Sequence, residues 1–467
     1  MNPPAPVQVP FDNVQGLIVR PYTHPVSCYE LVHFDTPAGA RAFLKAIVPL
    51  VTSAQPWGAN VPRRLLNIGL SYTGIQAAQA LSPAALAWLP EDFTALPPSE
   101  TLGDTGIPTP WWDAAHSVDF HCLVSLWADA AATLDDFIRD IESAARAAGV
   151  TVLRVRPDGE KIRGALFSEM RKLHFDYLDG ISAPNIGWAD PVEPPQIDFR
   201  YYLLGYGTLA IQSTPQSLPG VVPGLDEAVK FVTDGTYLAL RIMHQDVAGF
   251  NRFLEDNARL LAPVLGRSQA DTIEWLAAKM LGRWRTGEPL ALCPDQRSPA
   301  CALSNDFDYT DDPQGMKCPA SAHIRVVNPR SEVIDPPHRP IPRLLRRGMP
   351  YGPRLEGIHD DGMERGLIGL FLCNSLHANF EKLLTWINRN DFAPIFSELK
   401  TLRAQDPLLG NRAVSLASKE FLMPRAAGNV KGVGLTTFVQ SRGTAYFLLP
   451  GLKALRRLAG LLSTDDA

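Results

Sequence analysis

Two acids stand three residues apart in the aromatic and apolar stretch FDYLDGISAP, which covers residues 175–184. Asp179 is followed at once by Gly180, and Asp176 precedes both. An ionised carboxylate among apolar neighbours is costly unless it is paired or hydrogen-bonded. The stretch is therefore either an ordinary Asp-Gly surface turn or a poised acid that moves protons in a dry pocket.

A single histidine, His323, lies in the run CPASAHIRVVNPR, residues 318–330. The alternation in the four residues that follow it, IRVV, predicts a short strand or extended segment. A lone histidine beside apolar residues is most often a packing residue, but a neutral imidazole in an apolar cavity is also a common axial ligand of haem iron. Arg325 and Arg330 follow it and are either solvated arginines or partners for the two carboxylates of a haem.

Two adjacent arginines precede a glycine in LLRRGMPYG, residues 344–352. Such a pair is usually surface decoration, yet a guanidinium beside a haem iron stabilises charge as a peroxide O–O bond breaks. In an extended chain successive side chains point to opposite faces, so only one of the two faces a pocket. We assign that position to Arg346.

Repeated elements indicate how these groups are positioned, because one pattern of strand, polar break and amphipathic helix occurs four times. The four copies begin at residues 29, 121, 237 and 367, and the strand at 65–72 falls between the first two. Two copies of strand–helix–strand make one split βαβ unit. The sequence therefore predicts an α+β fold of two tandem ferredoxin-like units, with antiparallel sheets and helices packed on their faces.

The proline-rich run PVEPPQ separates the two predicted units. We expect an N-terminal domain at residues 1–190, which ends in the FDYLDGIS segment, and a C-terminal domain at residues 197–467. The second domain contains a long insertion at about residues 281–352, rich in Pro, Asp, Arg and Gly. A segment of that length within a compact domain is either disordered or functional, and its residue types favour function.

Composition narrows the class of protein. The chain has 467 residues, 46% of them hydrophobic and 20% charged, with a net charge of -5. That charge gives no basic footprint for nucleic acid or a membrane surface, and we expect neither as a partner. Signal peptide and membrane-span patterns are not seen. The six cysteines, listed by position as 28, 122, 293, 301, 318 and 373, predict free core thiols in a reducing cytoplasm.

Taken together, these motifs resemble the dye-decolourising peroxidases, a haem peroxidase family built from two ferredoxin-like halves. The family signature Gly-x-x-Asp-Gly appears as DYLDG, the proximal segment as CPASAHIRVVNPR and the distal segment as LLRRGMPYG. The resemblance covers nearly the whole chain, from about residue 14 to about residue 447, and is greatest to the larger, later-diverged branch.

The resemblance implies one haem b in a pocket of the C-terminal half. It implies His323 as the iron ligand, Asp179 as the distal acid–base group and Arg346 as the distal cation. Further cofactor contacts are implied at Gly180, Ile181, Ser182, Arg325, Arg330 and Glu381. Glu381 is expected to accept the N–H of the proximal imidazole. The partners implied are hydrogen peroxide and a small organic reductant, such as a phenol or dye, oxidised in one-electron steps; an oligomer is also possible.

One departure from the family pattern opens an alternative. Asp176 replaces the first signature glycine. If its carboxylate points into the pocket, like-charge coupling favours the protonated form of Asp179 and weakens peroxide deprotonation; if it points outward, little changes. The alternative function is a haem-binding, haem-handling or sensing protein with weak peroxidase activity.

Overall fold

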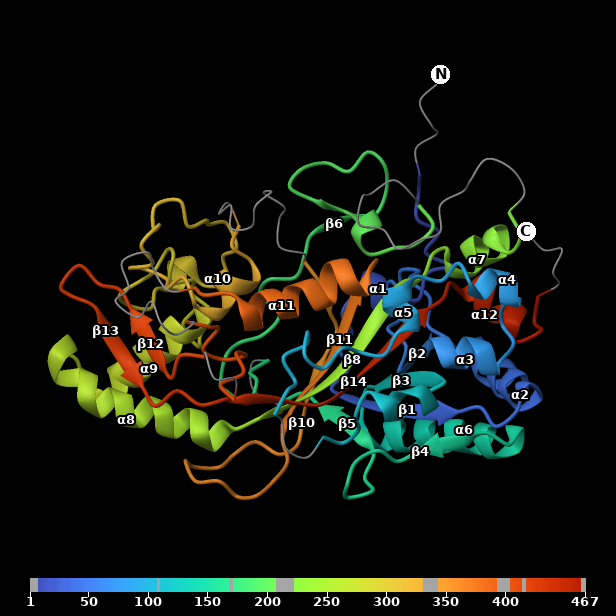
Figure 1. Cartoon of the computed structure of the whole chain (residues 1–467), viewed down its shortest axis with the longest axis horizontal. Helices are drawn as coiled ribbons and strands as arrows, with labels where there is room; N and C mark the ends of the chain where they lie inside the picture. Colours follow the sequence, from blue (N-terminus) through green and yellow to red (C-terminus); the bar gives the residue numbers. More distant parts are fainter. Residues whose placement is uncertain are drawn as a thin grey trace.

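A ten-stranded antiparallel sheet forms the centre of the protein (Figure 1). The computed structural model describes residues 7–106, 110–167, 171–206, 222–330, 343–392, 404–413 and 417–462. The strand order is β10-β11-β8-β14-β2-β3-β1-β4, with β5 paired to β1 and β9 to β11. These strands are β1 Val26–His33, β2 Arg64–Leu70, β3 Cys122–Ala128, β4 Thr151–Leu153, β5 Ile162–Ala165, β8 Thr236–Gln245, β9 Leu345–Arg346, β10 Met349–Tyr351, β11 Gly366–Cys373 and β14 Val439–Leu449.

Each half of this sheet comes from one half of the chain. The strands β1 to β5 lie before residue 166, and the strands β8 to β14 lie after residue 235. The two halves meet where β14 pairs with β2, and Leu448 opposite Leu70 is the paired position. Gln15 is buried at this seam and donates from its Nε2 to the carbonyls of Ile68 and Pro450. The arrangement confirms the predicted α+β architecture with repeated units, while the boundary near residues 190–197 stays a prediction.

Helices pack on one face of the sheet and at both of its ends, while loops and short helical turns cover the other face. In Figure 1, α8 and α9 lie at one end, beside the hairpin β12–β13, and α2, α6 and α12 lie at the other. The longer helices are α2 Pro37–Ile47, α6 Ala131–Ala148, α7 Leu225–Val232, α8 Val247–Leu265, α9 Gln269–Leu281, α11 Lys382–Arg389 and α12 Leu452–Leu458. The shorter ones are α1 Gly16–Val19, α3 Tyr72–Ala77, α4 Pro83–Leu86, α5 Glu91–Thr94 and α10 His323–Val327, with a π-helical turn η5 at Leu376–Glu381. The minor strands are β6 Ile186–Gly187, β7 Ile197–Asp198, β12 Glu420–Met423 and β13 Val430–Val433.

Strand β1 shows why the sheet is buried on both faces. Alternate side chains of a strand point to opposite faces. Cys28 and Val32 join one hydrophobic cluster, whereas Tyr29 and Leu31 join another. The burial of both sets explains the near-continuous apolar run of this strand, which a one-sided sheet would not need.

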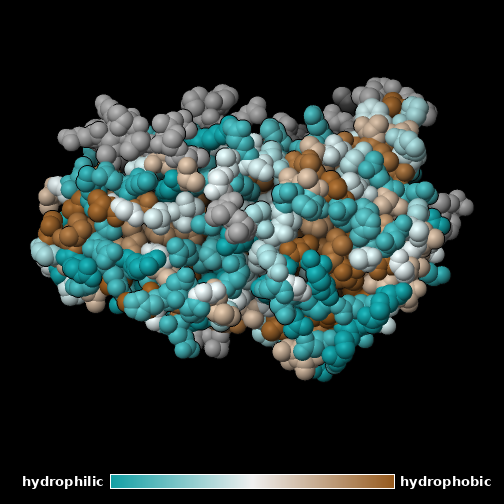
Figure 2. Space-filling view, turned by 60° about the horizontal axis from the view of Figure 1, so that its bottom comes forward, coloured by the Kyte–Doolittle hydropathy of each residue, from teal (hydrophilic) through white to brown (hydrophobic). Residues whose placement is uncertain are grey.

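Hydrophilic residues cover most of the face shown in Figure 2, with apolar residues in small patches between them. Among the exposed apolar side chains, Leu260 and Val264 on α8 are the most accessible, at 62% and 64%. Within the parts of the chain that the structure describes, none of the helices has the length and apolar character needed to cross a membrane.

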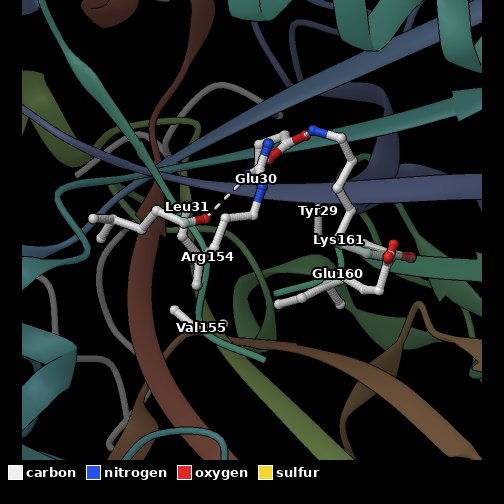
Figure 3. A pocket seen from close by; sticks show the side chains of 9 residues that line it. Tyr29, Glu30, Leu31, Arg154, Val155, Glu160 and Lys161 are labelled. Carbon is white, nitrogen blue, oxygen red and sulfur yellow. Dashed lines mark hydrogen bonds and ion pairs between the residues drawn. The ribbon is translucent and has the colours of Figure 1, made fainter. Parts of the chain in front are cut away.

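One edge of β1 is paired with β4 over part of its length and with β5 over another part, and a gap in the pairing lies between the two. Strand β4 pairs with β1 from Leu31 onward, and β5 pairs with it up to Tyr29. Glu30 lies between the two, and Arg154, Glu160 and Lys161 line the shallow cleft beside it (Figure 3). The chain between β4 and β5 therefore has to be fastened by side chains rather than by a strand ladder.

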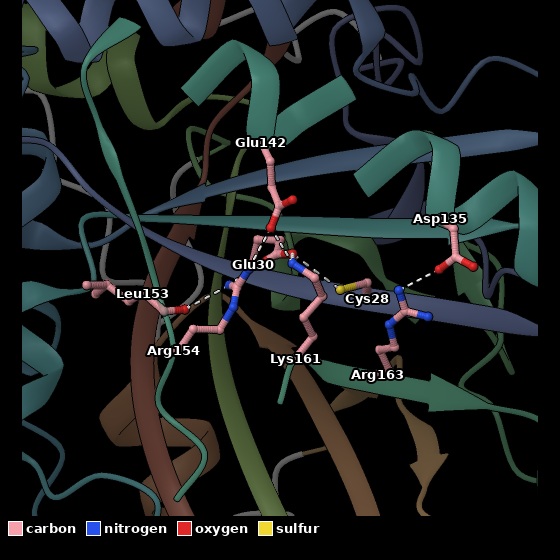
Figure 4. A network of polar contacts seen from close by, with 8 residues as sticks. All are labelled: Cys28, Glu30, Asp135, Glu142, Leu153, Arg154, Lys161 and Arg163. Atoms are coloured by element: carbon pink, nitrogen blue, oxygen red, sulfur yellow. Dashed lines mark hydrogen bonds and ion pairs between the residues drawn. The ribbon is translucent and has the colours of Figure 1, made fainter. Parts of the chain in front are cut away.

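A charge network does this fastening (Figure 4). The carboxylate of Glu30, only 2% exposed, accepts from Arg154 at 2.9 Å and from Lys161 at 3.0 Å. Both cations also contact Glu142 of α6. Two acids and two bases in contact neutralise one another, which makes the burial of Glu30 tolerable.

The cysteines differ from expectation at one pair. Cys293 and Cys301 form a disulfide, whereas Cys28, Cys122, Cys318 and Cys373 are buried free thiols. The prediction that all six are thiols is wrong for this pair, because a spacing of eight residues carries no recognisable motif in sequence. Disulfides persist mainly in oxidising compartments, so thin cysteine usage no longer supports a cytoplasmic location, which stays a prediction.

Candidate active site

His323 is held by a buried carboxylate that lies 83 residues further along the chain. Its Nδ1 is 2.7 Å from Oδ2 of Asp406. The Asp406 side chain is fully buried, while that of His323 is 17% exposed. The contact fixes the ring and makes Nδ1 the protonated nitrogen, which leaves the Nε2 lone pair free to bind a metal.

The loop around Asp406 is built to hold an ionised acid. Oδ1 accepts from the backbone N–H groups of Leu408 at 2.8 Å and Leu409 at 3.0 Å. Burial acts to raise the pKa of the Asp406 carboxyl, but the His323 imidazole and these two donors outweigh it, so the pKa is lowered. Arg412 donates to the Asp406 carbonyl at 2.6 Å and so fixes the loop from behind.

His323 begins a short helix, α10, and the extended segment predicted for the four residues after it is wrong. The backbone N–H groups of Arg325 and Val326 both donate to the carbonyl of Ala322. Trp386 of α11 donates from its indole to the Val326 carbonyl at 2.9 Å. Tertiary contacts thus override the β-branched composition of this run, as they often do for short segments.

The segment that carries Asp179 is fixed at several points. The Asp179 backbone N–H donates to the Arg171 carbonyl at 3.0 Å. Asn305 donates from its side-chain amide to the carbonyl of Ile181. Asp179 and Gly180 are exposed, and the Asp179 carboxylate has no protein partner within the described residues. A carboxylate held in place but unpaired is suited to exchanging a proton with a small molecule.

The two adjacent arginines point in different directions, as expected for an extended pair. Arg346 is exposed, and its Nη2 lies 3.4 Å from Oγ of Ser182. Arg347 is buried and donates to the carbonyls of Leu17 at 2.8 Å and Ile18 at 3.1 Å. Arg346 is therefore the one that meets the segment bearing Asp179.

The Asp176 carboxylate is paired with two cations. Its Oδ2 accepts from Lys172 at 2.9 Å and its Oδ1 accepts from Arg354 at 2.8 Å. The backbone at Asp176 has a φ of 67°, a left-handed conformation in which glycine is the easiest residue and aspartate is among the more tolerated others. The substitution at the first signature position is thus met by local ion pairs.

The guanidinium of Arg325 is occupied inside the protein. It donates to Oδ2 of Asp312 at 3.2 Å and to the Cys318 carbonyl at 2.6 Å, and it is 2% exposed. These contacts commit its N–H groups to the loop before His323 and speak against the cofactor contact implied for it, which stays a prediction. Arg330 remains suitable: it donates to the carbonyl of Asn305 at 2.8 Å and is not fully buried.

Glu381 does not accept the proximal imidazole N–H, and this expectation is also corrected. Its Oε2 lies 3.0 Å from Nδ1 of His377, and its Oε1 accepts from the Tyr446 hydroxyl at 2.9 Å. Asp406 occupies the position expected for Glu381. In sequence, Asp406 stands in AQDPLLG, where an Asp-Pro pair reads as an ordinary turn; only its distance from His323 reveals the role.

The donor groups of these residues are of the kinds that a haem requires. Such a cofactor needs an imidazole donor and cations for its two carboxylates. His323 offers Nε2, oriented through Nδ1 by Asp406. Arg330 and Arg346 make no carboxylate contact within the described residues, so their remaining N–H groups are available. This donor set, rather than any single residue, matches the chemistry that a haem requires.

Comparison with known proteins shows which family the chain belongs to. No family model matches the chain. It is 30% identical to a dye-decolorizing peroxidase of Exidia glandulosa, over 95% of this chain and 86% of that protein. It is 26% identical to one from Auricularia auricula-judae, over 95% and 86%. The structure of a variant of the dye-decolorizing peroxidase from Pleurotus ostreatus, 22% identical, matches with a TM-score of 0.76 over 97% of this chain and 99% of that one; it shows the shared fold. The chain therefore belongs to the dye-decolorizing peroxidases, which are oxidoreductases that act on hydrogen peroxide.

Proposed function

We propose that this protein is a haem b peroxidase that uses His323 as its iron ligand and oxidises small organic donors, such as phenols or dyes, in one-electron steps. The observation that carries the proposal is the 2.7 Å contact between His323 and the buried Asp406. A carboxylate on the second nitrogen makes the imidazole more basic and fixes its orientation. Arg330 would hold a carboxylate of the cofactor.

When bound, the haem supplies the redox chemistry that reduces peroxide. The protein supplies the proton movements and the charge stabilisation. Asp179 takes a proton from the inner oxygen of hydrogen peroxide and returns it to the outer oxygen, which leaves as water. Arg346, 3.4 Å from Ser182 on the same segment, stabilises negative charge that develops as the O–O bond breaks. Gly180, Ile181 and Ser182 keep Asp179 at this position.

The alternative, a haem-handling or sensing protein with weak peroxidase activity, depended on Asp176 facing the pocket. Its contacts with Lys172 and Arg354 remove that motive. We therefore favour the enzyme and carry the alternative only as an outcome of the test.

An optical spectrum tests the proposal. The protein is purified after expression with adequate haem supply, and its Soret band is recorded before and after one equivalent of hydrogen peroxide, then after a phenolic donor. We expect a band that changes with peroxide and is restored by the donor. A stable spectrum under the same treatment would support the haem-handling alternative. Absence of a Soret band, or full haem occupancy with an unchanged spectrum in His323→Ala, would refute the proposed ligand.

A further inference from the structure

A buried tyrosine is joined to the surface through a carboxylate and an imidazole. Tyr446 of β14 is 5% exposed, and its hydroxyl donates to Oε1 of Glu381 at 2.9 Å. The other oxygen of that carboxylate, Oε2, lies 3.0 Å from Nδ1 of His377. The side chain of His377 is 80% exposed, whereas that of Glu381 is 8% exposed. The three groups thus form one continuous path from the interior to solvent.

The proposed mechanism uses none of these three residues. They lie on η5 and β14, and the chain bends into a π-helical turn where His377 and Glu381 face each other. Single π-turns occur often at functional sites. Burying the Glu381 carboxylate is costly. If its partners served only to neutralise its charge, a tyrosine and an exposed histidine would be an unusual pair.

Two aromatic rings connect Tyr446 to the candidate active site. Phe371 of β11 lies directly opposite Arg346 in the β9–β11 pairing, and such cross-strand partners project from the same face of a sheet. The Phe371 ring centroid lies 5.4 Å from that of Phe380, and Phe380 lies 6.1 Å from Tyr446. Closely spaced rings of this kind offer a short path for an electron between Tyr446 and the distal group Arg346.

We infer that Tyr446 is a redox-active residue that gives up an electron toward the active site and its proton to Glu381. The inference rests on the proposed function, because hydrogen peroxide reduced there is the oxidant. The O–H bond of Tyr446 breaks, the proton moves to Oε1 of Glu381, the electron passes along Phe380 and Phe371, and a neutral phenoxyl radical remains. An organic donor returns the electron, and the proton returns from Glu381.

The proton path is what makes Tyr446 suitable. Burial, with the Glu381 carboxylate next in importance, raises the pKa of Tyr446 well above its ordinary value, so the phenolate is not available and the proton has to leave together with the electron. Glu381 accepts that proton within hydrogen-bond distance. The exposed imidazole of His377 then shares it with solvent. Other charged or titratable groups near these three are Arg241, Cys373 and Asp92.

The sheet also supplies a matched control. Tyr237 of β8 lies opposite Leu448 of β14, so it projects from the same face as Tyr446 and is fully buried in the same hydrophobic cluster. In the described part of the chain its hydroxyl has no hydrogen-bond partner. Without a proton acceptor, Tyr237 should resist oxidation although its ring is equally buried.

Freeze-quenched electron paramagnetic resonance tests the inference. The haem-loaded protein receives one equivalent of hydrogen peroxide without a donor, and peroxide consumption is measured in the same samples. Ring-deuterated tyrosine identifies a tyrosyl signal by its altered hyperfine pattern. We expect this signal in the wild type and in Tyr237→Phe, and its loss in Tyr446→Phe. In Glu381→Gln, which accepts the hydrogen bond but not the proton, we expect the signal to form about 100-fold more slowly, a typical rate contribution of a positioned proton acceptor.

The outcomes separate the two proposals. Consumption of peroxide with no tyrosyl signal, or with a signal that survives Tyr446→Phe, would overturn the role of Tyr446 and leave the peroxidase standing. A signal that forms at the wild-type rate in Glu381→Gln would overturn the proton path. Failure of the haem-loaded protein to consume peroxide would overturn the proposed function, and the inference with it.

Discussion

His323 and Asp406 meet at 2.7 Å across 83 residues of chain, and that pairing orients the imidazole. The carboxylate is fully buried and is satisfied by two further backbone donors, so it is a fixed acceptor rather than a mobile surface group. The basicity and orientation of the proposed iron ligand thus depend on a loop far from it in sequence.

We expect Asp406→Asn to weaken haem binding about 10- to 100-fold. This is the usual effect of losing the carboxylate that accepts the N–H of a metal-bound histidine. Asparagine keeps the shape but not the charge that makes the imidazole basic. Haem titration of the cofactor-free protein measures the change. Glu381→Gln is the control, since Glu381 contacts His377 and Tyr446 instead; an equal loss in both variants would argue against Asp406.

Asp179→Asn should retain haem but slow the reaction with peroxide about 100-fold or more, because the amide cannot accept the proton. Stopped-flow absorbance at the Soret band measures the rate against peroxide concentration. Asp176→Asn provides the comparison, since its carboxylate is paired with Lys172 and Arg354. Wild-type rates in Asp179→Asn would move the acid–base role to another residue.

Substitutions at Asp176 should affect stability more than catalysis. Asp176→Gly loses two partly exposed ion pairs, each worth about 0.2–1 kcal/mol, but relieves the left-handed backbone at φ 67°. Asp176→Ala loses the same pairs and keeps the strain, which costs about 1–2 kcal/mol. Urea unfolding should therefore rank wild type and Asp176→Gly close together and Asp176→Ala below both. The opposite order of the two variants would contradict this account.

Glu30→Gln should destabilise the protein by about 3 kcal/mol, the lower end for a broken buried charge pair, because Glu142 still contacts Lys161 and Arg154. Chemical denaturation measures the change. The matched control is Asp135→Asn, which breaks a half-exposed pair with Arg163 and should cost no more than about 1 kcal/mol. Similar losses in both variants would show that burial of Glu30 does not matter.

Acid should destabilise the protein through protonation of Glu364. Burial acts to raise the pKa of Glu364, but hydrogen bonds from His244 and Arg442 lower it from 4.5 to about 2. A group with a lowered folded-state pKa stabilises the protein above its ordinary pKa, and this stabilisation is lost as pH falls toward the lowered value. The Tyr351 hydroxyl donates to the same carboxylate at 3.0 Å. Glu364 therefore contacts the chain five positions after Arg346.

Urea unfolding across pH checks this prediction. Between pH 4.5 and about 2, the wild type should lose stability more steeply than Glu364→Gln, which has no charge there to neutralise. At neutral pH the variant should be the less stable of the two. Parallel pH profiles would show that other carboxylates account for the acid dependence.

Local pattern was sufficient to predict the fold. The strand predicted at residues 65–72 is β2, Arg64–Leu70, since period and polar caps are local properties. The alternation of an extended chain predicted that Arg346 and Arg347 point to opposite sides, and the two have different partners. Contacts between distant segments carry no such local signal. For that reason Asp406 was missed, Glu381 was given its role, and the disulfide between Cys293 and Cys301 was not expected.

The seam between β14 and β2 has a consequence for either half on its own. In the intact protein these two strands are paired at Leu448 and Leu70, and Gln15 bonds to both sides of this contact. A fragment that contained only one half would expose unpaired backbone N–H and C=O groups at this strand edge. Such an edge can pair with a second copy of the fragment. If the two halves are produced separately, each should aggregate, and they should become soluble only when they are combined and associate.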